Sequence, residues 1–155
     1  MSLVSLQRSL AGVNHIALDT SIFIAAGDAS DERSGCAAWL VDAIESGQFR
    51  CTLSVVSAAE LMVGGFRKSV EDGAARRAYL ANYPNLSIVP LSLDLATDAA
   101  HLRGATKLDL PDAIVLATAI DAGCDAIVHG DREWIKRAKN YAAKLSMIYL
   151  GDHCP

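Results

Sequence analysis

Short apolar runs alternate along this chain with segments whose apolar residues recur at helical spacing. The runs are too short for helices and are typical of strands buried on both faces of a sheet. The predicted strands are Ile16–Leu18, Phe49–Val55, Leu86–Leu91, Asp125–His129 and Met147–Leu150.

Between these runs, apolar residues repeat every three or four positions, the period of a helix with one buried face. In the first such segment Cys36, Leu40 and Ile44 repeat, and Gly47 supplies a stop signal. The predicted helices are Asp31–Gly47, Ser57–Phe66, Glu71–Tyr83, Asp94–Lys107, Pro111–Ala122 and Asp131–Lys139. Helices that separate short apolar strands predict a parallel α/β sandwich.

Length and composition favour one domain. The chain has 155 residues, 52% of them hydrophobic, which is enough to bury a substantial core. We expect a single domain over residues 14–155, preceded by a loosely attached extension over residues 1–13. That extension lacks the continuous apolar region of a signal peptide, and no run is long enough to span a membrane.

Charge and cysteine content restrict the function further. The net charge of −4 offers no attraction for a nucleic acid, unless bound metal ions supply positive charge. The cysteines (Cys36, Cys51, Cys124 and Cys154) include no C-x-x-C pair, so we expect reduced, mostly buried thiols in a cytoplasmic protein.

Four carboxylates are the candidate chemical groups: Asp19, Glu60, Asp112 and Asp131. Each has an ordinary structural explanation. Asp19 and Asp131 follow predicted strands and could cap helices. Glu60 could close a capping box with Ser57, and Asp112 could favour the dipole of a helix that begins at Pro111.

Taken together, the four positions favour a shared site. All lie near the carboxyl end of a predicted strand or the start of a helix, and therefore near one edge of a parallel sheet. Carboxylates gathered there would repel one another unless a cation neutralised them, and oxygen ligands suit Mg²⁺ or Mn²⁺. Such a site is typical of phosphodiester hydrolysis.

The motifs around these carboxylates resemble those of PIN-domain ribonucleases, in particular the VapC-like toxins of VapBC-type toxin–antitoxin modules. The resemblance extends from His15 to Leu150, and the block around Asp112 is its most specific part. The matching segments are Leu18–Ser21, Ser57–Leu61, Leu110–Ala119 and His129–Asp131.

The resemblance implies a three-layer α/β/α sandwich with a five-stranded parallel sheet. It also implies a Mg²⁺- or Mn²⁺-dependent endoribonuclease that cleaves single-stranded RNA, inhibited by a cognate antitoxin and assembled as a homodimer. By position, Asp19, Glu60, Asp112 and Asp131 would form the catalytic and metal-binding quartet.

The chain departs from the family pattern at three positions. His129 stands where Thr or Ser is usual, Asp109 is an additional carboxylate, and Ser21 stands where relatives often have Asn. We interpret His129 as a strand-end residue and Asp109 as a helix-start residue. Ser21 could cap the following turn or hydrogen-bond a ligand carboxylate, and with Arg67 and Lys68 it is a candidate substrate-binding residue.

Basic residues after Glu60 are candidate contacts for RNA or for an acidic antitoxin segment. Arg67 and Lys68, with Arg76 and Arg77, form the densest positive group, although a solvated helix face explains them equally well. A receiver-like site is disfavoured, because there is no adjacent acidic pair after the first strand and no phosphoacceptor Asp after the middle strand. A D-x-D phosphatase site is disfavoured because Ser21 occupies the place of the second Asp. A non-catalytic PIN-like module that binds RNA or a partner remains the alternative.

Overall fold

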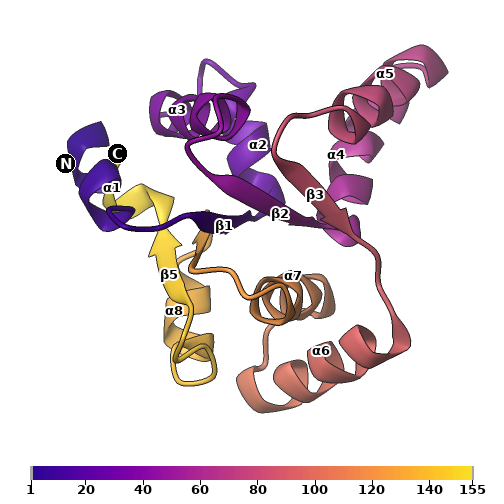
Figure 1. The fold of residues 1–155 in the computed structure, drawn as a ribbon. Helices are drawn as coiled ribbons and strands as arrows, with labels where there is room; N and C mark the ends of the chain where they lie inside the picture. The colour runs from indigo at the N-terminus through magenta and orange to yellow at the C-terminus, as the bar shows by residue number, and fades with distance from the viewer. Residues whose placement is uncertain (1, 155) are drawn as a thin grey trace.

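A central parallel sheet organises the computed structural model, which describes residues 2–154 (Figure 1). Its five strands are arranged in the order β3-β2-β1-β4-β5, and every neighbouring pair is parallel. The strands are β1 (His15–Leu18), β2 (Arg50–Ser54), β3 (Leu86–Val89), β4 (Ala126–His129) and β5 (Ser146–Tyr149). This confirms the predicted α/β fold with a five-stranded parallel sheet.

Helices connect the strands and cover both faces of the sheet. Those that the sequence pattern predicted are α3 (Ser34–Glu45), α4 (Val55–Phe66), α5 (Val70–Ala81), α6 (Leu93–Thr106), α7 (Leu110–Asp121) and α8 (Glu133–Ala138). Two further helices, α1 (Leu3–Ser9) and α2 (Thr20–Ala26), and the 3-10 turn η1 (Leu150–Asp152) were not predicted. Within residues 2–154, none of these helices has the length and apolar character needed to cross a bilayer.

Alternation along the strands divides the core into layers, because successive side chains point to opposite faces. Ile16 and Leu18 pack with α1, α2 and α3, whereas Ala17 between them packs with α6, α7 and α8. Leu53 lies in a smaller cluster beneath α4 and α5. The central strands β1, β2 and β4 are therefore largely buried on both sides, as their apolar sequences predicted, whereas the edge strands β3 and β5 are partly exposed.

Residues near both ends of the chain pack against α3. Leu6 and Leu10 are buried in the core, so the segment that we expected to be loosely attached contributes a packed helix. The hydroxyl of Ser5 and Nδ1 of His153 are hydrogen-bonded at 2.9 Å, and the ends marked N and C lie side by side in Figure 1.

A disulfide joins Cys36 on α3 to Cys154, with their Cα atoms 6.3 Å apart. Our expectation of four reduced thiols is therefore wrong for this pair. The two cysteines are 118 residues apart in sequence, and only the fold brings them together. Cys51 and Cys124 are free and buried, and burial raises the pKa of Cys124 to about 11.

Candidate functional site: an acidic edge of the sheet

Asp19 and Asp131 lie at the point where the strand order reverses. The chain proceeds from β1 outward to β3 on one side, and β4 and β5 extend the sheet on the other. Asp19 directly follows β1, and Asp131 follows β4 by two residues. Open α/β sheets bind ligands at this kind of topological switch point, outside the carboxyl ends of the strands.

Both carboxylates are fixed by local hydrogen bonds. Asp19 is the N-cap of α2, and its Oδ2 accepts a 2.6 Å hydrogen bond from the hydroxyl of Ser21. Oδ1 of Asp131 accepts a 2.8 Å bond from the backbone N–H of Glu133 at the start of α8. Each residue therefore has a helix-start role, and that role also holds its carboxylate at the sheet edge.

Gly130 allows these two turns to approach closely. A Cβ built at Gly130 would lie only 2.6 Å from Oγ of Ser21 and 3.0 Å from Nη1 of Arg33. The guanidinium of Arg33 is held by Asp31 at 2.7 Å and so reaches the same corner. Sequence reasoning placed Gly130 in a matching motif but did not identify this close approach, and it missed Arg33, because both proximities to Ser21 depend on the tertiary fold.

Asp112 brings a third carboxylate to the edge from the first turn of α7. Burial, and then the charges of Asp19, Asp131 and Asp109, raise the pKa of Asp112 to about 6, against an opposing interaction with the Trp134 side chain. The charges of Asp19 and Asp131 act on Asp112, so these carboxylates lie close enough to interact. A cation placed among them would favour the ionised form of Asp112.

Glu60 reaches the site by a different route. It lies in the second turn of α4, and its Oε2 accepts a 2.5 Å hydrogen bond from the buried hydroxyl of Thr20, next to Asp19. The capping-box explanation for Glu60 is wrong, because Ser54, not Ser57, is the N-cap of α4. Sequence reasoning did not identify Thr20 as the partner.

His129 ends β4 and is completely buried. Its ring stacks on Trp134, with centroids 5.1 Å apart and planes 13° apart. Burial lowers the pKa of His129, and neither ring nitrogen has a hydrogen-bond partner among residues 2–154. It is a strand-end residue, as we interpreted it, but one with a polar ring enclosed in the core.

The remaining candidates lie away from the acidic edge or on its rim. Asp109 is exposed and forms a 3.8 Å ion pair with Arg103, consistent with a helix-start role. Arg67 and Lys68 follow α4 and are exposed. They lie seven and eight residues beyond Glu60, so about 10–12 Å farther along the helical path.

A divalent cation fits the donor chemistry of this edge. The carboxylates supply hard oxygen ligands. The pKa of Asp112 is raised first by burial and then by the charges of Asp19, Asp131 and Asp109. Among residues 2–154, no three His, Cys, Asp or Glu side chains are close enough to form a ready-made metal site. Closer approach of the carboxylate oxygens would accompany binding of an ion.

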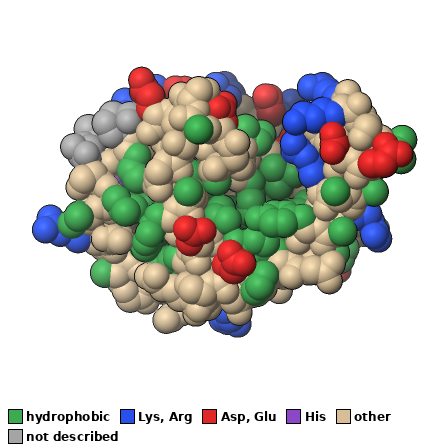
Figure 2. Space-filling model, turned by 90° about the horizontal axis from the view of Figure 1, so that it is seen from above, with side chains coloured by type: hydrophobic (Ala, Val, Ile, Leu, Met, Phe, Trp, Pro, Cys, Tyr) green, Lys and Arg blue, Asp and Glu red, His purple; other side chains and the backbone are tan. Residues whose placement is uncertain are grey.

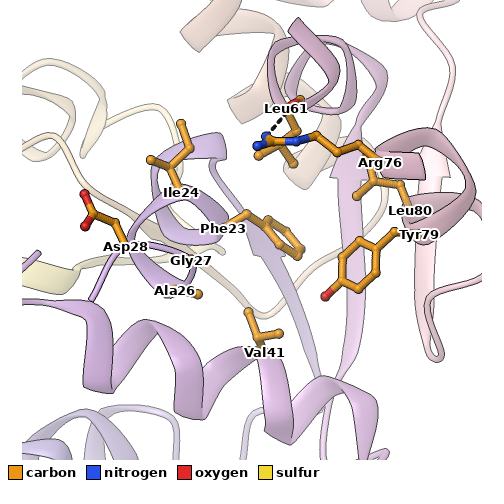
Figure 3. A pocket seen from close by; sticks show the side chains of 10 residues that line it. All are labelled: Phe23, Ile24, Ala26, Gly27, Asp28, Val41, Leu61, Arg76, Tyr79 and Leu80. Atoms are coloured by element: carbon orange, nitrogen blue, oxygen red, sulfur yellow. Dashed lines mark hydrogen bonds between the residues drawn. The ribbon is translucent and has the colours of Figure 1, made fainter. Parts of the chain in front are cut away.

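A separate apolar groove lies between α2, α3, α4 and α5, with a cavity of about 490 Å³. Figure 2 shows hydrophobic side chains lining a hollow that is bordered by Lys and Arg on one side. In Figure 3, Phe23 and Tyr79 face the cavity, and Arg76 donates a 2.9 Å hydrogen bond to the carbonyl of Leu61 at its rim. Lys68 lines an adjoining cavity with Arg76 and Tyr79.

Comparisons with known proteins agree on the fold. The family model of the PIN domain matches residues 16–140. A toxin–antitoxin complex from Klebsiella pneumoniae is 24% identical, with a TM-score of 0.63 over 87% of this chain and 97% of that one. FitAcB from Neisseria gonorrhoeae is 21% identical, with a TM-score of 0.63 over 88% and 98%.

A third structure is VapC20 from Mycobacterium tuberculosis, described as a toxin that cleaves the sarcin–ricin loop. It is 21% identical, with a TM-score of 0.59 over 72% of this chain and 86% of that one. A comparison with curated protein sequences gives no significant match.

Proposed function

The chain belongs to the PIN domain family, and from this premise we propose that it is a Mg²⁺- or Mn²⁺-dependent endoribonuclease that hydrolyses single-stranded RNA. The observation that carries the proposal is the convergence of Asp19, Asp112 and Asp131 at the switch point of the sheet. Within toxin–antitoxin modules, such an enzyme would act as the toxin, in the cytoplasm.

In this proposal Asp19, Asp112 and Asp131 hold the cation through their carboxylate oxygens. When bound, the cation would supply Lewis acidity and offset the charge that develops on the phosphate during hydrolysis. Asp112 must be ionised to contribute. Its pKa is about 6 without metal, and a bound cation would lower that pKa.

Glu60 would orient the attacking water. The hydroxyl of Thr20 occupies Oε2 of Glu60, which leaves Oε1 free to accept a hydrogen bond from water. Ser21 would keep the carboxylate of Asp19 in place through its 2.6 Å bond. The hydrogen bonds that Glu60 and Ser21 make in this structure support these two roles.

The decisive assay uses purified full-length protein and labelled single-stranded RNA. We expect no cleavage in EDTA and restored cleavage on addition of Mg²⁺ or Mn²⁺. Cleavage that survives EDTA and repeated purification would refute the metal-dependent mechanism. RNA binding without cleavage under every metal condition would favour the alternative of a non-catalytic PIN-like module.

We also infer that the apolar groove binds the cognate antitoxin. Ile24 on its wall is 56% exposed, which suits an apolar partner segment. Arg76 and Lys68 on one side would suit acidic residues at one end of that segment, and Asp28 on the groove's wall would suit a basic one. The structures from Klebsiella and Neisseria that share this fold are a toxin–antitoxin complex and FitAcB, respectively.

This inference is tested with the small protein encoded beside the gene. Ile24→Glu should abolish co-purification of the two proteins, because the groove would then contain an unpaired charge. Leu93→Glu is the matched control, since Leu93 lies on α6 and is 82% exposed. Equal binding by both variants would exclude the groove as the docking site.

A further inference from the structure

The buried ring of His129 is unusual because it is both fully enclosed and without hydrogen bonds. Its exposed fraction is 0%, and Nδ1 and Nε2 lack partners among the described residues. Buried polar groups are normally hydrogen-bonded, so an orphaned imidazole requires an explanation. The contacts of the imidazole are the stacking of its ring and an interaction with the backbone of Asp131, which falls outside hydrogen-bonding geometry.

The His129 ring is part of a group of stacked side chains. It stacks on Trp134 with centroids 5.1 Å apart, and it lies 6.1 Å from the ring of Tyr149, its partner residue on β5. Tyr149 in turn lies 5.1 Å below the guanidinium of Arg132, which pairs with Asp152 at 2.8 Å. Aromatic and cation–π contacts at these distances are attractive.

These contacts enclose the turn that carries Asp131. His129 precedes the turn, and Arg132 and Trp134 follow Asp131 directly. The backbone N–H of Trp134 donates to the carbonyl of Asp131 at 3.3 Å. Three side chains within six residues therefore fix the turn from both ends, and Trp134 is itself buried to 1% exposure.

We propose that His129 is a positioning residue for the candidate cation site: its ring seats Trp134 and Tyr149 and thereby holds the Asp131 carboxylate at the sheet edge. The inference rests on the proposed function, because it concerns the same acidic site. The inference predicts that cation affinity requires a planar ring at position 129. It also predicts that cation affinity does not require the imidazole nitrogens.

Two substitutions separate these properties. His129→Phe keeps an aromatic ring and removes both orphaned nitrogens, so cation affinity should stay within about twofold and the melting temperature should hold or rise. His129→Leu fills a similar volume without a planar ring. Loss of residues that orient metal ligands typically weakens metal binding about 10–100-fold, and we expect His129→Leu to do so.

The readout is direct binding of Mn²⁺ to purified full-length protein, followed by electron paramagnetic resonance, together with thermal melts in EDTA. Phe49→Leu is the matched control for stability, because Phe49 forms an edge-to-face pair with Trp39 in the opposite layer of the core. This control should lower the melting temperature and leave Mn²⁺ affinity unchanged. If His129→Leu does not fold, Tyr149→Leu provides a second test. It removes another ring of the same group at a half-buried position, and it should weaken Mn²⁺ binding.

The possible results are distinct. Weakened Mn²⁺ binding in His129→Leu or Tyr149→Leu, with normal binding in His129→Phe and Phe49→Leu, supports the inference. Unchanged binding in the ring-deleting variants overturns it while leaving the proposed function intact. If the wild-type protein binds no Mn²⁺, the proposed function and this inference both fail.

Discussion

The hydroxyl of Thr20 donates a 2.5 Å hydrogen bond to the carboxylate of Glu60, and so connects the start of α2 to the second turn of α4. Thr20 is buried, whereas Glu60 is otherwise exposed. An exposed Glu side chain would otherwise sample several rotamers. The contact with Thr20 therefore selects the rotamer of Glu60 that points toward the sheet edge where Asp19 lies.

Removal of that contact should impair the site. We expect Thr20→Val to reduce Mn²⁺-dependent RNA cleavage about tenfold or more, since Glu60 would lose the bond that orients it. Thr52→Val is a matched control: Thr52 is also buried, and its hydroxyl bonds His15 at 2.8 Å near the start of β1. Equal loss of activity in both variants would indicate general destabilisation instead of a role in orientation.

Substitution of Asp112 separates catalysis from folding. Asp112→Asn should reduce cleavage by orders of magnitude, because a ligand charge is lost, yet it should hold or raise the melting temperature in EDTA. Asp109→Asn, three residues earlier on an exposed side chain, should leave cleavage intact. A fully active Asp112→Asn protein would mean that the site lies elsewhere.

The raised pKa of Asp112 predicts a pH dependence of stability without metal. The usual pKa is 3.8 and the folded-state pKa is about 6, so the native protein holds a proton that the unfolded chain releases between these values. The free energy of unfolding should therefore decrease as pH rises from 4 to 6, by about 1 kcal/mol after solvent screening. Chemical denaturation in EDTA measures this change.

Asp112→Asn should abolish this decrease in the free energy of unfolding between pH 4 and 6. An unchanged decrease in the variant would assign it to other groups. Cleavage in saturating RNA should show the opposite trend. Activity at limiting Mn²⁺ should decrease as pH falls below about 6, because protons then compete with the cation for Asp112.

The disulfide between Cys36 and Cys154 should contribute to stability. Because the bond closes a loop of more than a hundred residues, its reduction should lower the free energy of unfolding by about 2–5 kcal/mol. Alkylation of the unfolded, unreduced protein should modify only Cys51 and Cys124, as mass spectrometry would reveal. Modification of all four thiols would show that the bond does not form under the conditions of purification.

Apolar residues near the turn between α4 and α5 suggest a homodimer. The apolar side of α4 includes Leu61, Met62 and Phe66, of which Leu61 is buried and Phe66 is about half exposed. Val63 and Val70 are also exposed, at 46% and 72%. We expect a dimer in sedimentation at micromolar concentration and a monomer for Val63→Glu; a monomeric wild-type protein would contradict the proposal.

The sequence predicted the sheet well because buried parallel strands require apolar residues on both faces, as at Ile16–Leu18 and in β4. It did not predict α1 or α2, which have seven residues each. The packing of α1 depends on Leu6 and Leu10 meeting distant parts of the chain. Local patterns carry no information about such contacts.

The same distinction applies to the candidate site. Strand-end positions were enough to predict that Asp19 and Asp131 would share an edge. The link between Thr20 and Glu60 joins residues 40 apart and has no local signature. Ser57 matched a capping box, but the helix begins earlier, at Ser54, because β2 ends there.

The contact between Ser5 and His153 has a consequence for protein engineering. Because the two ends meet, a short linker could close the backbone into a ring, which a new break in the exposed turn near Asn140 would reopen. In such a circular permutant, β5 would come first along the chain and yet remain beside β4. The acidic edge depends on the spatial neighbourhood of the strands, so it should survive this change in the order of synthesis.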